Sequence, residues 1–433
     1  MDILIGVGLL LALIVLGVPV GFALGISGVI SLFMMVPTPV VMGLMAEVVH
    51  HTASNYVLLT IPMFVLMAEL LTASGIAKDL MIACNRLLGR IKGGLAMACV
   101  LAGSVLAAAS GSSTASVASI ASAAFPSMKS LGYDEGFSIG TMAIAGTLAI
   151  MIPPSIAFVV YGIITEESIG RLFIAGMIPG ILTALGYVLT ISVAVRVWPH
   201  LAPDPGKIAE QIRSGGTAMR QYGKVWPVVL LVAIVMGALY SGLATPTEVG
   251  AIGAFGALVI SLMLRRMSRQ ALVRATGNTL RTTSMIVTII FGAMLFGYFM
   301  AYTKVTDEMI RWIAEVGLSP YTVLLLIVVV YLVLGMFMDQ FAIIVLTVPI
   351  THAVLTGLGF DGIWLGIIIV KTAEIGLVSP PLGLNVFVAS GATGVSAQKG
   401  FKGAAPFIVV DLLILALLIA FPSISLFLPE LMR

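Results

Sequence analysis

Long apolar runs, separated by short polar stretches, recur along the chain from Leu4 to Leu428. A helix needs about 20 mainly apolar residues to cross the hydrocarbon core of a bilayer, and runs long enough for this occur repeatedly. A single membrane anchor does not account for so many runs. The pattern predicts an all-α polytopic membrane protein.

Composition agrees with a bilayer as the main solvent. Of 433 residues, 60% are hydrophobic and only 9% are charged, with a mean hydropathy of +1.16, whereas soluble domains carry roughly 25% charged residues. These values exclude a soluble enzyme. The 22 Lys and Arg nearly balance the 19 Asp and Glu, and no basic face supports nucleic-acid binding. Cys84 and Cys99 lack metal-ligand spacing, and we expect both to be packing residues.

Helix-breaking residues recur in the second half of the chain at a constant offset of 227 positions. The matched pairs are Pro19 and Pro246, Gly132 and Gly359, Asp134 and Asp361, Pro153 and Pro380, Pro154 and Pro381, Gly176 and Gly403, and Pro179 and Pro406. Such an offset predicts two structural repeats, residues 1–195 and 225–433, joined by a polar linker over 196–224. Chance agreement among common Gly and Pro residues is the alternative.

Equivalent loops of the two repeats differ in charge, which indicates that the repeats are inverted in the membrane. Residues 76–92 are basic and their counterparts, 303–317, are slightly acidic; residues 264–281 hold five Arg and no acid, whereas 37–54 hold no Lys or Arg. Because Lys and Arg accumulate in cytoplasmic loops, we expect the linker to be cytoplasmic and both termini to be periplasmic. The first apolar run lacks the marks of a cleaved signal peptide, so we expect it to be retained.

The stretches 76–92 and 303–317 each combine an apolar face with a charged face. Ile76, Leu80 and Leu87 fall on one side of the first stretch, and its charges fall on the other. This pattern predicts helices that lie in the plane of the membrane interface. A pair of such helices would hold one part of the protein at a fixed height while another part moves; a solvated helix without a mechanical role is the alternative.

Each repeat contains a long apolar run with a polar interruption at its centre. Residues 94–125 are interrupted by the run Ser110–Ser116, and residues 321–355 are interrupted at Met338-Asp339-Gln340. Irregular backbone at membrane depth is tolerated only where it is buried in protein or lines a cavity. We therefore predict two re-entrant helical hairpins with the polar residues at their tips. For the first run, close packing of small residues between helices is the alternative.

A double proline follows each predicted hairpin, at Pro153-Pro154 and at Pro380-Pro381. Two consecutive prolines part a helix, so residues 136–165 and 362–392 are each expected to form a broken transmembrane helix. The carbonyls at the end of a half-helix suit a cation such as Na⁺, and the amides at the start of one suit a carboxylate. A proline kink without a ligand is the alternative.

Three charged residues fall at membrane depth, where charge is costly and often functional. Asp339 lies at the second hairpin tip and either supplies an oxygen to a cation or pairs with a buried basic group. Lys371 and Glu374 are three residues apart on one helix, so an ion pair is the favoured interpretation. Contact between Lys371 and an anionic substrate is the alternative.

At these motifs the chain resembles the large membrane subunit of the tripartite ATP-independent periplasmic (TRAP) transporters, over nearly its whole length. The resemblance rests on the motifs Gly111-Ser112-Ser113-Thr114-Ala115-Ser116, Ile152-Pro153-Pro154-Ser155, Met336-Phe337-Met338-Asp339 and Glu374-Ile375-Gly376-Leu377-Val378-Ser379-Pro380-Pro381-Leu382-Gly383-Leu384-Asn385.

The resemblance implies a secondary transporter, not an enzyme, in the bacterial inner membrane. It implies Na⁺ as the coupling ion, no cofactor, and an elevator motion of the domain that bears the hairpins. Its implied partners are a periplasmic binding protein that delivers a small organic acid, and a small membrane subunit of about four spans. Because the two repeats use up this chain, we expect the small subunit to be a separate chain.

Carried onto this sequence, the family's sites place Na⁺ where each hairpin tip meets its broken helix. The first site is then expected at Ser112, Ser113, Pro153 and Ser155, and the second at Asp339, Gly376, Ser379 and Asn385. The residues expected to contact the substrate are Ser110, Gly111, Ser112, Thr114, Lys371 and Asn385.

The nearest alternative function is a stand-alone carrier, either a Na⁺-coupled dicarboxylate carrier or a cation/proton antiporter of a related inverted-hairpin fold. Independence from partner proteins would distinguish it from the tripartite system. A channel lacks support, because the sequence shows neither a filter motif nor rings of acidic residues. The sequence does not indicate which acid is carried.

Overall fold

A computed structural model describes residues 2–88, 91–203 and 226–431, and every regular element in these segments is a helix. This confirms the all-α prediction. Six of the described helices are long and apolar enough to cross a bilayer, and α8 with α9, bent by 40°, makes a seventh, broken span. The elements of the first half are α1 (Asp2–Val15), α2 (Val20–Met35), α3 (Thr38–Ser54), η1 (Tyr56–Leu59), α4 (Thr60–Ala73), α5 (Ile76–Leu88), α6 (Gly94–Ser110), α7 (Ser113–Leu131), α8 (Glu135–Met151), α9 (Ile156–Thr165), α10 (Ile169–Val197) and η2 (Pro199–Leu201).

The second half repeats this series of helices, except that one long helix, α14, stands where the first half has α3, η1 and α4. Its elements are α12 (Trp226–Tyr240), α13 (Pro246–Met263), α14 (Arg269–Thr303), α15 (Val305–Val316), α16 (Pro320–Gly335), α17 (Gln340–Gly357), α18 (Gly362–Gly376), α19 (Leu384–Thr393), α20 (Ala397–Ala420) and α21 (Ser423–Leu431). Shifted by 227 positions, α7, α8 and α9 fall on α17, α18 and α19 to within two residues at their starts. The sequence offset therefore reflects a repeated series of helices.

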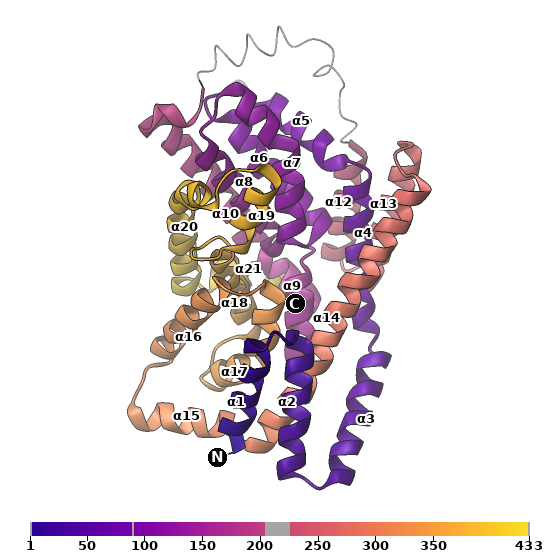
Figure 1. The fold of residues 1–433 in the computed structure, drawn as a ribbon, viewed down its shortest axis with the longest axis vertical. Coiled ribbons are helices and arrows are strands. Elements are labelled where there is room, and N and C mark those ends of the chain that lie inside the picture. Colours follow the sequence, from indigo (N-terminus) through magenta and orange to yellow (C-terminus); the bar gives the residue numbers. More distant parts are fainter. Residues whose placement is uncertain (1, 89–90, 204–225, 432–433) are drawn as a thin grey trace.

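The two repeats are inverted relative to each other (Figure 1). Helix α5 lies near one end of the long axis of the molecule, and its counterpart α15 lies near the opposite end, together with the N-terminus. Residues 204–224 of the expected linker lie outside the described residues. The C-terminal helix α21 lies near the middle of the long axis, against α10, and the periplasmic position of both termini stays a prediction.

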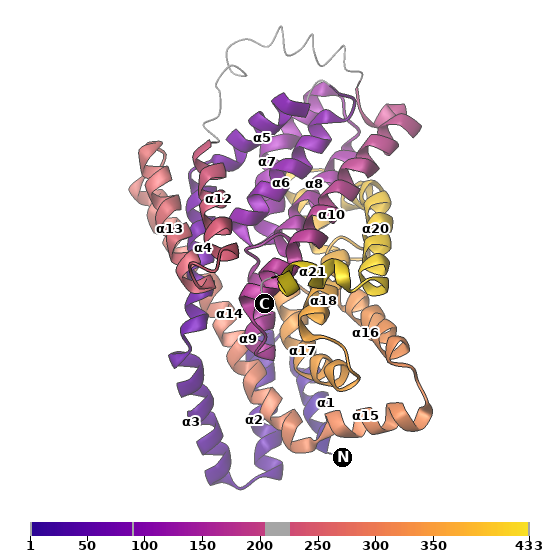
Figure 2. The same cartoon turned by 180° about the vertical axis from the view of Figure 1, so that it is seen from behind.

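The helices form two groups, and α5 and α15 are the two helices that connect them along the chain. In the first, which we call the scaffold group (residues 2–73 and 226–303), the long helix α14 packs against α2 and α4, and α13 packs against α4. In the second, the hairpin group (residues 94–197 and 320–420), α8 packs against α6, α7 and α20. Helices α10 and α20 lie side by side at the edge of the hairpin group (Figure 2). Residues 76–88 and 305–316 are helical as expected, and their position in the plane of the membrane interface stays a prediction.

Both re-entrant hairpins are present, with tips at residues 111–112 and 336–339. The first one differs from the expectation at its far end, because α7 continues through Pro126 to Leu131. It ends where Gly132 adopts a left-handed conformation, with φ +84°, and the amide of Tyr133 donates to the Met128 carbonyl oxygen. A C-terminal glycine turn of this type ends helices efficiently, whereas Pro126 removes a single hydrogen bond from this helix.

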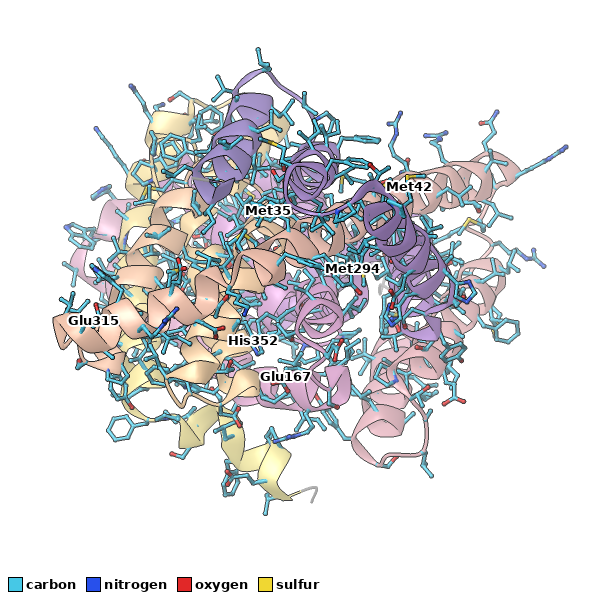
Figure 3. All side chains as sticks on the ribbon, turned by 90° about the horizontal axis from the view of Figure 1, so that it is seen from below. Met35, Met42, Glu167, Met294, Glu315 and His352 are labelled. Carbon is cyan, nitrogen blue, oxygen red and sulfur yellow. The ribbon has the colours of Figure 1, made fainter. Side chains whose placement is uncertain are left out.

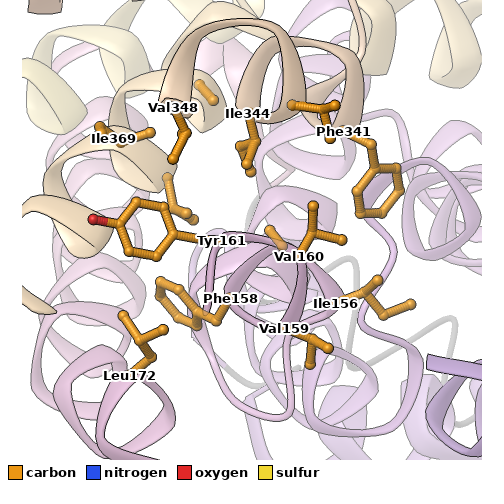
Figure 4. Packing of buried hydrophobic residues seen from close by; sticks show 14 of the residues in the cluster. Ile156, Phe158, Val159, Val160, Tyr161, Leu172, Phe341, Ile344, Val348 and Ile369 are labelled. Carbon is orange, nitrogen blue, oxygen red and sulfur yellow. The ribbon is translucent and has the colours of Figure 1, made fainter. Parts of the chain in front are cut away.

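The broken helices exchange partners between the repeats. Helix α9, the second half of the first broken helix, packs against α17 of the second hairpin, and α19 packs against α7 of the first hairpin. Figure 4 shows the first of these contacts, in which Val160 and Tyr161 of α9 face Ile344 and Val348 of α17. All four side chains are buried. Each hairpin is therefore held by residues that lie about 175 to 280 positions away in the chain.

Helix α8 is buried from Gly136 to Met151, and its contact with α20 leaves no space for a side chain at Gly140 or Gly403. A methyl group added to Gly403 would lie 1.9 Å from the carbonyl oxygen of Gly136, and one added to Gly140 would meet the backbone at Gly403. Such contacts require the two backbones to move apart. Close packing through glycine is a common way for membrane helices to associate.

We expect Gly403→Ala to destabilise the protein by about 1–3 kcal/mol, the usual range for overpacking a tight interior. Thermal unfolding of the purified chain in detergent measures this effect. Gly391→Ala is the matched control, because an added methyl group on this α19 residue meets nothing within 4 Å. Equal stability of Gly403→Ala and Gly391→Ala would contradict the close approach of α8 and α20.

Candidate functional site

The first hairpin tip lies against the break in the first broken helix. Gly111, in a left-handed conformation with φ +57°, forms the tip, and a methyl group added there would lie 3.2 Å from the carbonyl oxygen of Pro154. Pro153 and Ser155 in the break are buried, and Ser112 at the tip is partly buried. We call this meeting point junction 1. The side chain of Ser110 lies outside the described residues.

The second hairpin tip lies against the second break in the same way. The amide of Gly383 donates to the Met336 carbonyl oxygen at 3.3 Å, and the Gly335 and Gly376 backbones are in contact. Asp339 is exposed and caps α17, since its Oδ1 accepts from the amides of Phe341 at 2.9 Å and Ala342 at 3.2 Å. We call this meeting point junction 2.

A hydrogen bond between the repeats connects the two junctions. The hydroxyl of Ser113, at the start of α7, donates to Oδ1 of Asn385 in the first turn of α19 at 3.3 Å. Both side chains are buried. The structure therefore brings together two predicted site residues, one from each half, that are 272 positions apart in sequence.

Several buried polar atoms at the junctions have no hydrogen-bond partner among the described residues. They are Oγ of Ser155, Nδ2 of Asn385 and Oε1 of Gln340. Buried polar atoms are nearly always hydrogen-bonded, so each such atom in a structure calls for an explanation. An oxygen without a partner suits a hard cation, and an amide nitrogen without a partner suits an anionic oxygen.

Fixed charge is scarce at the junctions. Across the two tips and the two breaks, residues 111–116, 152–156, 336–341 and 377–385, the only charged side chain is that of Asp339. Among the described residues, groups of three or more His, Cys, Asp or Glu side chains that could hold a metal ion are absent. The polar atoms at the junctions are therefore hydroxyl, amide and carbonyl groups.

Lys371 is fully buried and is not at either junction. Its Nζ donates to Oδ1 of Asp411 at 2.6 Å and to Oε2 of Glu374 at 3.3 Å. The ion pair of Lys371 and Glu374 favoured by their spacing is present, while a contact between Lys371 and substrate stays a prediction. The hydroxyl of Tyr187 donates to Oδ2 of Asp411 at 2.7 Å.

The sequence analysis missed Asp411 and Tyr187. Asp411 is the single acidic residue of the mainly apolar helix α20. A charged residue within an apolar, membrane-spanning stretch is a signal of function, and it would have identified Asp411 from the sequence. Tyr187 carries no such signal, because tyrosine is common in apolar helices. The predicted packing role of Cys84 and Cys99 is confirmed, since both are buried free thiols.

A cavity of about 690 Å³ lies between part of the scaffold group and part of the hairpin group. Its walls include Thr52, Thr247 and Met294 of the scaffold group and Glu167 in the turn between α9 and α10. Figure 3 shows Met294 and Glu167 from the end of the molecule where α15 lies. Burial, reinforced by the charge of Asp361, raises the pKa of the Glu167 carboxyl above its usual range. The cavity shows that the two groups are not packed together along their whole interface.

Replacing Lys371 by Met would leave the buried carboxylates of Glu374 and Asp411 without a cation. Breaking a buried ion pair in this way costs about 3–5 kcal/mol, and we expect a corresponding loss in thermal unfolding. The double variant Lys371→Met/Asp411→Asn removes one of the two unpaired charges and should recover part of the loss. A Lys371→Met variant as stable as the wild type would show that the ion pair does not hold this part of the fold.

Known proteins resemble this chain in both sequence and fold. A family described as "Tripartite ATP-independent periplasmic transporter, DctM component" matches residues 7–424. The C4-dicarboxylate TRAP transporter large permease protein DctM of Pseudomonas aeruginosa is 38% identical over 409 residues, with 94% of each chain covered. The sialic acid TRAP transporter large permease protein SiaM of Vibrio cholerae is 27% identical, with 97% of each chain covered.

A further relative and a solved structure extend the comparison. The isethionate TRAP transporter permease protein DctMQ of Oleidesulfovibrio alaskensis is 31% identical over 96% of this chain and 64% of its own length. The crystal structure of the YdaH transporter of Alcanivorax borkumensis superposes with a TM-score of 0.65 at 15% identity, covering 88% of both chains. The latter is a likeness of fold alone. The match to the family over nearly the whole chain, with the relative at 38% identity, shows that this protein belongs to the TRAP transporter family as a large membrane permease subunit of the DctM type.

Proposed function

We propose that this chain imports a small organic acid across the bacterial inner membrane and that the sodium gradient drives the import. The observation that carries the proposal is the meeting of two hairpin tips and two helix breaks, joined by the hydrogen bond from Ser113 to Asn385. Discontinuous helices at corresponding positions of inverted repeats are where secondary transporters bind substrate and coupling ions.

Na⁺ would bind at both junctions. At junction 1 the ligands would come from Ser112, Ser113, Pro153 and Ser155, and the unpartnered Oγ of Ser155 supports this assignment. At junction 2 they would come from Asp339, Gly376, Ser379 and Asn385. The carbonyl ends of α8 and α18 carry partial negative charge, which favours a cation there.

The substrate would bind between the junctions. A carboxylate needs positive charge, yet Asp339 is the only charged side chain of the tips and breaks, and Lys371 is already paired with Glu374 and Asp411. Bound Na⁺ ions would supply that charge. The unpartnered Nδ2 of Asn385 would donate to the carboxylate, with further contacts from Ser110, Gly111, Ser112 and Thr114.

The names of the relatives indicate the class of substrate. They name C4-dicarboxylate, sialic acid and isethionate, all of them organic acids. The relative at 38% identity is a C4-dicarboxylate permease, so a four-carbon dicarboxylate is the first candidate for this chain. A direct contact between Lys371 and the acid would require this fully buried side chain to become accessible.

Transport would proceed by an elevator motion, in which the hairpin group moves along the membrane normal while the scaffold group stays fixed. Helices α5 and α15, at opposite ends of the molecule, are the connections between the groups (Figure 1). The cavity of about 690 Å³ between the groups provides space for such a movement. A small four-span membrane subunit and a periplasmic binding protein would complete the transporter.

Sodium binding is testable without a substrate. We expect the thermal unfolding midpoint of the purified chain to rise with NaCl but not with KCl at constant ionic strength, because a ligand that binds only the folded state stabilises it. Ser112→Ala and Asp339→Asn should each weaken the rise. Asn caps a helix about as well as Asp, so Asp339→Asn removes the charge while the cap of α17 is retained.

Asp134→Asn is the matched control for Asp339→Asn. Asp134 caps α8 through a hydrogen bond from the amide of Phe137 at 2.8 Å and lies away from both junctions. A full Na⁺ response in Asp339→Asn would remove Asp339 from the ion site. Identical curves in Na⁺ and K⁺ for the wild type would contradict sodium coupling at these junctions.

Partner dependence is tested in proteoliposomes that contain this chain with or without its small membrane subunit. We expect uptake of a radiolabelled C4-dicarboxylate only when that subunit, the binding protein and an inward Na⁺ gradient are all present. Uptake by the chain alone would instead support a stand-alone carrier. The control is a K⁺ gradient of the same size.

A further inference from the structure

A continuous chain of buried polar contacts runs through the hairpin group beside the two junctions, and all but the contact between Thr147 and Tyr187 are hydrogen bonds. Thr147 Oγ1 lies 3.4 Å from the hydroxyl of Tyr187, which donates to Asp411 at 2.7 Å. Asp411 accepts from Lys371 at 2.6 Å, and Lys371 donates to Glu374 at 3.3 Å. All five side chains are fully buried. We call these five residues the buried relay.

The buried relay begins and ends at equivalent positions of the two repeats. Thr147 in α8 and Glu374 in α18 are 227 residues apart, which is the offset of the repeats. Each also contacts the residue three positions before it, because Thr147 donates to the Ile144 carbonyl oxygen at 2.7 Å and Glu374 accepts from Lys371. The relay therefore joins the same point of the two broken helices through α10 and α20, in addition to the direct packing of α8 against α18.

Both ends of the relay lie about one turn or less from a junction. Thr147 is four residues before Met151, where α8 ends, and Glu374 is two residues before Gly376, where α18 ends. The carbonyls that each junction offers to a cation belong to these last turns. A change in the orientation of one last turn therefore acts directly on one end of the relay.

Three other buried or half-buried titratable side chains on helices packed against α18 have partners outside the relay. Tyr331 of α16 lies 2.8 Å from Thr351, Tyr161 of α9 donates to the Gly362 carbonyl oxygen at 2.7 Å, and His352 of α17 faces Glu167 at 3.7 Å. The relay is therefore a separate network, and its hydrogen bonds are shielded from water, which makes them strong and directional.

We propose that the buried relay couples the two junctions, so that a Na⁺ ion bound at one junction raises the affinity of the other junction for Na⁺. A first ion fixes the last turn of one broken helix. The relay fixes the matching turn of the second helix, and the second ion then binds to a site that is already ordered. This inference rests on the proposed function, since it requires Na⁺ to bind at both junctions.

Tyr187→Phe tests the coupling with the smallest change, because it removes the hydroxyl at the centre of the relay and keeps the ring packed against Phe407. The full-length chain in detergent is titrated with NaCl at constant ionic strength, and the thermal unfolding midpoint is recorded at each concentration. We expect the wild type to show a Hill coefficient above 1, towards the limit of 2 for two sites. In Tyr187→Phe the coefficient should fall to about 1, and the Na⁺ concentration at half-effect should rise about fivefold or more.

Tyr331→Phe is the matched control. Tyr331 is also a buried tyrosine, 1% exposed, and loses one hydrogen bond, to Thr351, but it does not belong to the relay. We expect this variant to unfold at a lower temperature with the Hill coefficient of the wild type. A loss of stability alone is thereby separated from a loss of coupling.

Thr147→Val provides a second test from the other end of the relay, with Thr372→Val as its control. Thr372 is equally buried, and its hydroxyl donates to Ile368 of its own helix at 2.7 Å. The coefficient should fall in Thr147→Val and stay unchanged in Thr372→Val.

The possible outcomes separate this inference from the proposed function. A Hill coefficient of 1 in the wild type, or an unchanged coefficient in both Tyr187→Phe and Thr147→Val, would overturn the coupling and leave sodium binding intact. An absence of any Na⁺-specific stabilisation in the wild type would overturn the proposed sodium coupling itself. The hydrogen bond between Ser113 and Asn385 is unchanged in every variant, so it does not account for a difference between them.

Discussion

Backbone amides and carbonyls at membrane depth have no water to bond with, so any break in a helix has to be satisfied by protein or by a bound ligand. This chain contains four such breaks within its hairpin group, and they lie together. The amide of Gly383 in one break donates to Met336 at a hairpin tip, and the amide of Asn385 donates to Leu377 across the break itself. Some backbone groups at the breaks are therefore hydrogen-bonded to one another. The polar atoms at the breaks that lack such partners form the candidate site.

The exchange of helix partners between the two repeats brings the four breaks together. Helix α9 packs against the second hairpin and α19 packs against the first, so neither repeat completes a junction without the other. The contact between Gly335 and Gly376 and that between α8 and α20 at Gly403 show how closely these backbones approach. A site built in this way is positioned by helices, which hold polar groups more firmly than loops do.

The two repeats share their backbone plan but differ in charge. Thr147 of the first repeat occupies the position of Glu374 in the second, and Ile144 occupies that of Lys371. In the second repeat Lys371 and Glu374 form an ion pair, and Asp411 accepts a further hydrogen bond from Lys371. In the first repeat the equivalent contact is the hydrogen bond from the Thr147 hydroxyl to the Ile144 carbonyl oxygen. Since the positive charge of Lys371 is taken up by carboxylates, an anionic substrate at the junctions would depend on bound cations for its charge balance.

The sequence by itself determined the local features of this protein. The apolar runs, the constant offset of Gly and Pro residues, the polar tips and the double prolines predicted two repeats with a hairpin and a broken helix each, because helix breaks follow from local backbone chemistry. The pairing of Lys371 with Glu374 was also predictable, because three positions along a helix bring two side chains together.

Only the tertiary structure decided how these features meet. The addition of Asp411 and Tyr187 to the ion pair, the bond from Ser113 to Asn385 and the exchange of α9 and α19 between the hairpins all join residues distant in sequence. The end of α7 at Leu131, beyond Pro126, depended on a glycine turn rather than on the proline. Such contacts arise from the way helices pack in three dimensions, which the spacing of residues along a chain does not specify.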